Sequence, residues 1–244
     1  MNDRIIIQKK ANQFRERYGI SSNEPIRIKS LLIKLNILTC YKPLTEFFSG
    51  MSLKGNRDNL FILVNSNHSL GRQHFTIAHE LYHLFEQENF KVHQCTTGKF
   101  DKKNIEEYNA DYFASCLLMP ENGIVDLIPD NELTTKNISL RTVIKLEQYY
   151  SISRSSMLLR LKLLDIIDTK QYEALKSYRA GETAMQYGYD TSLYKNGNQN
   201  LIIGDYGEKA KFLFDNEKIS EGHYLELMNS IGFDLSNFKD EYES

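Results

Sequence analysis

The sequence predicts an α+β protein, with helices and a small sheet in the N-terminal part and a mostly helical C-terminal region. Two observations support this fold class. Apolar residues recur at helical spacing over several long stretches, whereas Leu60–Val64 is a short apolar, partly β-branched run that is typical of a strand. With 244 residues, 41% of them apolar, the chain is long enough to bury a core in one large or two modest domains.

The N-terminal part combines helical periodicity with one turn signal. Lys54–Arg57 favours a turn just before the apolar run, and Pro120 ends the last helix of this part. The predicted elements are helices at Ile5–Tyr18 and Arg27–Leu35, a β-hairpin within Phe47–Asn65, and helices at Ser69–Gln87 and Asn104–Leu118.

The C-terminal part is predicted to be a loop followed by helices and one short strand. The predicted elements are helices at Leu140–Tyr150 and Ser153–Ile166, a strand at Leu201–Ile203, and helices at Glu208–Phe214 and Glu221–Ile231. Residues 136–180 carry nine basic and four acidic side chains, and residues 181–244 carry five and twelve. These shifts suggest a first domain at 1–120, a helix-turn-helix-like region at 121–176 and an acidic region of uncertain role at 177–244.

Composition excludes several classes of protein. The net charge of -2 argues against a wholly basic nucleic-acid binder. No apolar run approaches the roughly 20 residues of a membrane span, and the N-terminus lacks the pattern of a signal peptide. The three cysteines, Cys40, Cys95 and Cys116, are odd in number and show no paired spacing. We therefore expect a reduced, cytoplasmic protein without a membrane partner.

The sharpest feature is His79-Glu80-Leu81-Tyr82-His83, which has the form H-E-x-x-H within a helical stretch. A spacing of four residues places His79 and His83 one turn apart on the same helix face, where two imidazole nitrogens can hold one zinc ion. Glu80 lies beside them and is positioned to take a proton from water that the metal activates. The motif therefore predicts zinc-dependent hydrolysis.

A third ligand must come from elsewhere, because a catalytic zinc usually has three protein ligands and one position for water. The helix at 104–118 carries Glu107, Ala110, Asp111 and Ala114 on one stripe, and the alanines would let it approach the metal helix closely. Glu107 is the favoured ligand. Asp111, one turn further on, is expected to accept a hydrogen bond from a ligand histidine and orient it.

Alternatives to Glu107 remain open at this point. The start at Asn104 fits a capping box, in which Glu107 would only cap its own helix. Glu106, His93 and Cys95 are competing ligands. The sequence offers no unique donor to stabilise an oxyanion.

Two segments together resemble a known family. Phe75–His83 reads F-T-I-A-H-E-L-Y-H, and Glu107–Pro120 reads E-Y-N-A-D-Y-F-A-S-C-L-L-M-P. They resemble the ImmA/IrrE family of zinc metallopeptidases, with the pattern F-T-x-A-H-E-x-x-H followed by E-x-x-A-N-x-F-A-x-x-L-L-M-P. The resemblance covers roughly residues 10–165. The chain departs from the pattern at Asp111, where the family usually has asparagine, so the site would carry more negative charge.

The resemblance implies a zincin-like peptidase domain with one zinc ion per chain. His79, His83 and Glu107 would be the ligands, and Glu80 would be the general base. It also implies a regulatory endopeptidase that cleaves a helix-turn-helix transcriptional repressor and relieves repression, in a mobile element or a stress response. The region beyond about residue 170 varies within the family and is not covered by these expectations.

Two further features bear on partners. The strand at Leu60–Val64 is expected to be an edge strand, to which an extended substrate would add by backbone pairing. In the basic helix pair, Arg154, Arg160 and Lys162 are candidates to contact DNA phosphates. The favoured interpretation is instead that these helices pack on the rest of the protein and expose a solvated charged face. The alternatives to a peptidase are a metal-containing DNA-binding regulator and an antitoxin-like interaction protein without proteolysis.

Overall fold

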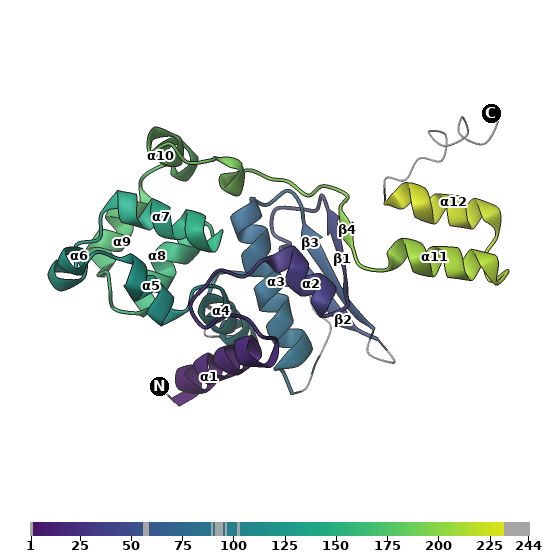
Figure 1. Cartoon of the computed structure of the whole chain (residues 1–244), viewed down its shortest axis with the longest axis horizontal. Coiled ribbons are helices and arrows are strands. Elements are labelled where there is room, and N and C mark those ends of the chain that lie inside the picture. The colour runs from purple at the N-terminus through teal and green to yellow at the C-terminus, as the bar shows by residue number, and fades with distance from the viewer. Residues whose placement is uncertain are drawn as a thin grey trace.

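The computed structural model confirms the α+β class (Figure 1). It describes residues 2–55, 59–88, 90, 95, 97–101 and 103–231, with side chains from residue 4 onward. The elements before residue 120 are α1 (Asn2–Arg17), α2 (Ile28–Lys34), β1 (Ile37–Lys42), β2 (Gly50–Lys54), β3 (Leu60–Asn65), α3 (Leu70–Phe85) and α4 (Ile105–Leu118).

The remaining elements are mostly short helices. They are α5 (Glu121–Leu127), α6 (Asp130–Thr135), α7 (Leu140–Tyr150), α8 (Arg154–Leu163), α9 (Thr169–Lys176), α10 (Ala180–Gln186), the 3-10 helix η2 (Ser192–Tyr194), β4 (Ile202–Ile203), α11 (Tyr206–Asp215) and α12 (Glu221–Ser230). The helices predicted at 140–150, 153–166, 208–214 and 221–231 and the strand predicted at 201–203 are all present.

The sheet has the order β2-β3-β1-β4. β3 is antiparallel to β2, which confirms the predicted hairpin, and it runs parallel to β1 on its other side. The prediction that Leu60–Val64 is an edge strand is therefore wrong, and β2 is the edge strand on this side. Sequence analysis missed β1 because three consecutive residues, Thr39, Cys40 and Tyr41, are buried, so the strand lacks the alternation of a half-exposed strand.

α3 lies between the sheet and α4, and α1 packs on α4 (Figure 1). The Phe14 ring of α1 meets the Phe113 ring of α4 edge-on, with centroids 5.8 Å apart. Ala110 and Ala114 are completely buried on α4, as predicted, and their small side chains allow the backbones of α3 and α4 to approach closely. This packing places the first turn of α4 against the second half of α3.

Two buried arginines satisfy the end of α4. The last carbonyl groups of a helix have no partner within the helix, and burying them unpaired is costly. Arg15 donates from Nε to the Leu117 carbonyl at 2.8 Å, and Arg160 donates from Nε to the Met119 carbonyl at 3.0 Å. Arg160 is 1% exposed, so this candidate phosphate contact does not reach the surface.

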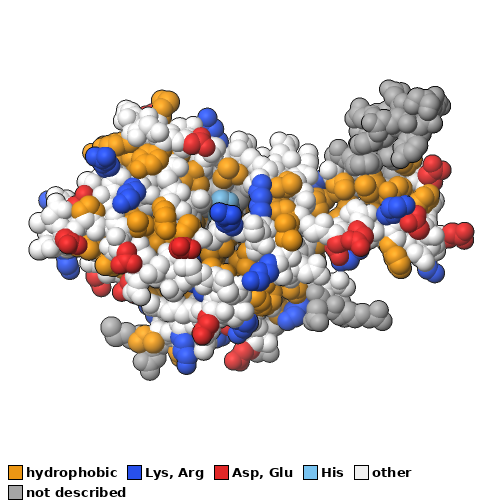
Figure 2. Space-filling model, viewed as in Figure 1, with side chains coloured by type: hydrophobic (Ala, Val, Ile, Leu, Met, Phe, Trp, Pro, Cys, Tyr) orange, Lys and Arg blue, Asp and Glu red, His pale blue; other side chains and the backbone are white. Residues whose placement is uncertain are grey.

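Arg154 is also buried, and it forms an ion pair with the buried Glu147 of α7. This second candidate phosphate contact is therefore also unavailable at the surface, because a buried partner engages its guanidinium. Lys162 is placed over the ring of Tyr172, with Nζ 5.1 Å from the ring centroid. On the face shown in Figure 2, Lys and Arg side chains are scattered among acidic and apolar ones. Two of the three candidate phosphate contacts are therefore engaged inside the protein.

The segment expected to be a loop after Pro120 contains α5 and α6 instead. Pro120 and Pro129 occupy their N-cap positions. Proline ends a preceding helix but is tolerated where a new helix begins, because the missing N–H has no helical partner there. Sequence analysis used Pro120 only as a stop signal. It also missed α9 and α10, which are short.

The region after residue 177 returns to the sheet. β4 pairs with β1 through Ile203 opposite Thr39, and α11 and α12 then form a helix pair that projects from this edge (Figure 1). One connected core extends from Ile7 of α1 to Ile203 of β4. The division at residues 120 and 176 stays a prediction. None of the described helices has both the length and the apolar character that crossing a membrane requires.

The buried pair of Glu147 and Arg154 generates a prediction about stability. Glu147 also accepts a hydrogen bond from the Tyr194 hydroxyl at 2.7 Å. Removing one partner of a buried pair leaves the other charge uncompensated, so we expect Glu147→Ala to lower the free energy of unfolding by about 3–5 kcal/mol. Urea denaturation measures it. Arg179→Ala, which breaks an exposed pair with Glu182, is the control and should leave the midpoint unchanged. Equal midpoints for both variants would contradict the assignment.

Candidate metal centre

α3 places two imidazoles side by side in the interior. His79 and His83 are 0% and 1% exposed, and their Nε2 atoms are 3.1 Å apart. The spacing of four residues along a regular helix is sufficient to produce this arrangement. Two ring nitrogens that face each other at this distance have to share a proton or a cation.

Glu107 completes the group from the first turn of α4. Its carboxylate has Oε2 3.3 Å from His79 Nε2 and Oε1 3.3 Å from His83 Nε2. One ligand atom from each of the three residues lies within 4.8 Å of the other two. The structure thus brings together the three residues that the sequence proposed as ligands.

The capping alternative for Glu107 is resolved by Asn104. The Asn104 side chain accepts from the Glu107 backbone N–H, so it caps α4. In a capping box the glutamate side chain would in turn accept a hydrogen bond from the backbone N–H of the cap residue. Here the Asn104 N–H already donates to the Asp101 carbonyl at 3.2 Å, and the Glu107 carboxylate turns toward the histidines.

The competing ligands lie elsewhere. Glu106 accepts a hydrogen bond from the Tyr82 hydroxyl at 3.0 Å and is not part of the group formed by His79, His83 and Glu107. His93 lies outside the described residues. Cys95 faces Glu80 and is considered below.

Each histidine is held through its second ring nitrogen. Asp111 Oδ1 is 2.9 Å from His79 Nδ1, in agreement with the orienting role expected for it. Gln87 Oε1 is 2.7 Å from His83 Nδ1. Such contacts fix the ring orientation and direct the other nitrogen toward a metal. Sequence analysis missed Gln87, although its spacing of four residues from His83 at the end of α3 was a usable signal.

The carboxylates strongly perturb His79. Burial lowers the pKa of this imidazole, but the hydrogen bonds with Asp111 and Glu107 outweigh burial and raise the pKa to about 10. The site thus provides strong negative potential at Nε2. A cation at this position would compete with that proton, because coordination requires a neutral imidazole.

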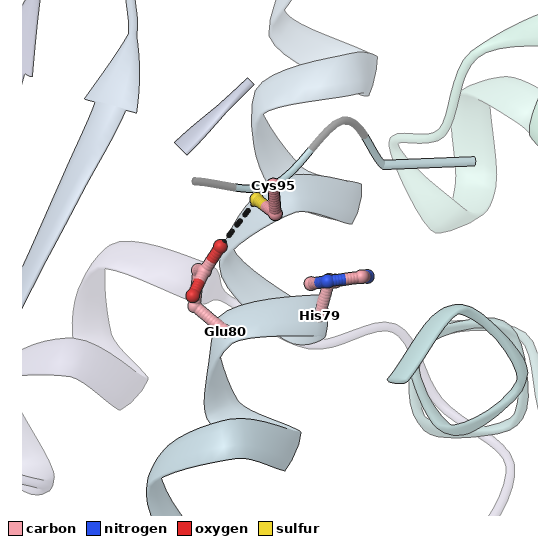
Figure 3. A group of neighbouring side chains, drawn as sticks. All are labelled: His79, Glu80 and Cys95. Atoms are coloured by element: carbon pink, nitrogen blue, oxygen red, sulfur yellow. Dashed lines mark hydrogen bonds between the residues drawn. The ribbon is translucent and has the colours of Figure 1, made fainter. Parts of the chain in front are cut away.

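Glu80 is held on the side of α3 that faces the sheet. Ser52 of β2 donates to Glu80 Oε2 at 2.7 Å, and the Cys95 thiol donates to Oε1 (Figure 3). Gly50, at the start of β2, lies so close to α3 that an added Cβ would be 2.6 Å from Thr76 Cγ2. A residue without a side chain is therefore needed for β2 to come this near to Glu80. Burial and the adjacent Glu80 raise the pKa of Cys95 well above its ordinary value.

The donor set fits a divalent metal ion. Two imidazole nitrogens and one carboxylate oxygen converge, and two histidines with one glutamate are a common ligand set of catalytic zinc in peptidases. A carboxylate able to act as a base lies next to this set, and the edge of a sheet runs past it. Fold and site together are those of a metallopeptidase.

Comparison with known protein families agrees with this class. The family described as Peptidase_M78, the IrrE N-terminal-like domain, matches residues 34–162, which is more than half of the chain. The chain therefore belongs to this family, and the resemblance stated from the sequence is confirmed. The match includes α3 and α4 and extends through most of α8. No match is found among curated proteins.

The geometry predicts that substitutions at Glu107 and at Asp111 reduce metal binding to different extents. Glu107→Ala removes a direct donor, so we expect it to lose most of the bound metal, as His79→Ala and His83→Ala should. Asp111→Ala removes an orienting partner and should weaken metal affinity by roughly 10–100-fold. Elemental analysis and chelator competition measure these effects. Glu106→Ala is the matched control and should keep its metal. Full metal retention in Glu107→Ala would exclude Glu107 as a ligand.

Proposed function

We propose that this protein is a zinc-dependent endopeptidase that cleaves a helix-turn-helix transcriptional repressor in the cytoplasm. The observation that carries the peptidase assignment is the convergence of His79, His83 and Glu107 beside Glu80. The cytoplasmic part is supported by the three cysteines, which are all free and buried. The repressor as substrate, in a mobile element or a stress response, is inferred from the family alone.

The chain's own residues divide the chemistry between them. His79, His83 and Glu107 would hold the ion, with the rings fixed by Asp111 and Gln87. When bound, zinc acts as a Lewis acid that polarises the scissile carbonyl and makes water more acidic. Glu80 takes the proton from the attacking water and then passes it to the leaving amine.

The edge strand β2 provides a place for an extended peptide. β2 pairs with β3 on one side, and Gly50 and Ser52 of β2 both lie next to Glu80. On its other side β2 pairs with Cys95 at Gly50, and a peptide that adds to the rest of that side would have its backbone alongside the general base. Backbone pairing gives affinity with little sequence specificity. This role replaces the one expected for Leu60–Val64.

The burial of two arginines in the basic helix pair argues against the alternative of a metal-containing DNA-binding regulator. Arg154 and Arg160, two of its three candidate phosphate contacts, are buried against Glu147 and the end of α4. The antitoxin-like alternative, like the DNA-binding one, requires no base at the metal centre. A substitution at Glu80 therefore separates proteolysis from both alternatives.

The first test is Glu80→Gln. Removing the base should lower cleavage by about 10²–10⁴-fold while the metal content stays at the wild-type level. The wild type and the variant are each co-expressed with the repressor encoded nearest the gene, and the repressor is followed on a gel. Relief of repression by Glu80→Gln with the repressor uncut would refute proteolysis in favour of a binding function.

A second test concerns the orientation of Glu80. Ser52→Ala removes one donor to a buried carboxylate, which is worth roughly 1.5–3 kcal/mol, so we expect cleavage to fall roughly 10–100-fold with metal retained. Ser115→Ala is the matched control, because Ser115 is buried but donates to the Tyr112 carbonyl within α4. Equal cleavage by Ser52→Ala and wild type would contradict the positioning role.

A further inference from the structure

A cavity of about 340 Å³ lies where the start of α3 meets the start of α8. The two helices pack closely there, since a Cβ added at Gly71 would be 2.5 Å from the Ser153 backbone nitrogen. The segment 97–100 and α9 form further walls. This volume is at the lower end of the range for small-molecule sites, so the cavity fits one compact ligand.

The charge of the cavity comes from Arg72 of α3, which is half-buried. Its guanidinium donates to the Ser49 hydroxyl at 3.3 Å. Burial lowers the pKa of Arg72, and the nearby Glu46 offsets only part of this effect. None of the described residues that line the cavity carries a carboxylate. The guanidinium therefore lacks an acidic partner within the cavity, which favours an anionic ligand.

Two lysines add positive charge next to the same cavity. The Nζ atoms of Lys162 and Lys176 are 5.1 and 5.5 Å from the ring centroid of Tyr172, and Tyr172 lines the cavity. Charges of one sign around a concave site raise the local concentration of ligands of the opposite sign. These lysines thus strengthen the preference for an anion that Arg72 sets.

The polar walls of the cavity consist of hydroxyl groups from three segments. They belong to Ser69, Thr97, Ser153, Ser155 and Ser156. A phosphate group has three strong acceptor oxygens that point in different directions, whereas a carboxylate has two in one plane. Hydroxyls on several sides of a guanidinium therefore suit a phosphate better. The apolar part of the lining would contact the body of the ligand, and it includes Phe75, Phe100 and Leu159.

One wall of the cavity also supports the metal centre. The Gly98 and Phe100 N–H groups donate to the Asp111 carboxylate at 2.8 Å each, and Asp111 Oδ1 is 2.9 Å from His79 Nδ1. Gly98 and Phe100 themselves line the cavity. A ligand that packs against them therefore acts on the residues that orient His79.

We propose that the cavity binds a small phosphorylated molecule with an apolar or ring-shaped body, and that this ligand is an effector of the metal centre. Arg72 pairs with the phosphate, and the surrounding hydroxyls donate to its oxygens. The ligand holds the segment 97–100 in place, and this segment holds Asp111 against His79. Ligand and metal therefore raise the affinity for each other by the same factor. The effector role rests on the proposed function, whereas binding of the ligand does not.

Phenyl phosphate is a suitable probe for the full-length protein, because it joins one ring to one phosphate. Isothermal titration calorimetry should show binding in the low millimolar range or tighter. Arg72→Met removes the charge, and Ser155→Asp places a carboxylate in the cavity at the second position of α8, where acidic residues are tolerated. Each should weaken binding at least roughly 10-fold. Arg141→Met, which removes an exposed arginine of α7 outside the cavity, is the matched control and should bind as the wild type does.

The two variants decide whether the cavity is the binding site. Phosphate bound on the metal would be insensitive to both substitutions, so equal binding by the wild type, Arg72→Met and Ser155→Asp would overturn the proposal. No binding by the wild type would overturn it too. Because Ser155→Asp keeps the contact of Arg72 with Ser49, it decides the question even if Arg72→Met is unstable. Benzoate should bind more weakly than phenyl phosphate, and equal affinity would refute the preference for phosphate.

Chelator competition with and without phenyl phosphate tests the effector role. The zinc affinity of the wild type should rise roughly 5-fold or more at saturating probe, and that of Ser155→Asp should not change. An unchanged zinc affinity in the wild type would refute the effector role. Failure of the wild type to bind zinc at all would instead refute the proposed function, while the titration with phenyl phosphate would still decide the assignment of the cavity.

Discussion

The close approach of α4 to α3 is the constraint on which the centre depends. Glu107 reaches both histidines only because Ala110 and Ala114 leave no side chain between the two helix backbones beyond a Cβ. α1 supports α4 from the other side through the contact of Phe14 with Phe113. Arg15 and Arg160 hold the far end of α4. The way α3 and α4 pack in the core thus sets the distances between the ligand atoms of His79, His83 and Glu107.

A concentration of buried and partly buried carboxylates is the second organising feature, since such groups are stable only with donors or a cation. Each carboxylate at the centre has a distinct set of partners. Glu80 receives a hydroxyl and a thiol, and Glu107 faces two imidazoles. These partners match the chemical roles proposed above. Glu80, the proposed base, is oriented by neutral donors, whereas Glu107, a proposed ligand, faces imidazoles that can exchange a proton for a metal ion.

The sequence predicted the centre better than it predicted the sheet. His79, His83, Glu107 and Asp111 were predictable because helical spacing alone fixes which side chains share a face, and the family pattern chose among the remaining carboxylates. β1 and the edge position of β2 were missed because sheet order depends on pairing between segments distant in the chain. The roles of Arg154 and Arg160 were also missed, since composition cannot distinguish a solvated charge from one that satisfies a buried carbonyl or carboxylate.

Asp111 shows how a departure from the family pattern is accommodated. Its Oδ1 accepts from the Gly98 N–H and contacts His79 Nδ1, while Oδ2 accepts from the Phe100 N–H at 2.8 Å. An asparagine has only one acceptor oxygen, so in this geometry its amide NH₂ would face a donor at one of these positions. The carboxylate therefore fixes residues 98–100 and the His79 ring together. The extra negative charge that the sequence implied at this position is distributed over three hydrogen-bond donors, and residues 98–100 are tied directly to the metal centre.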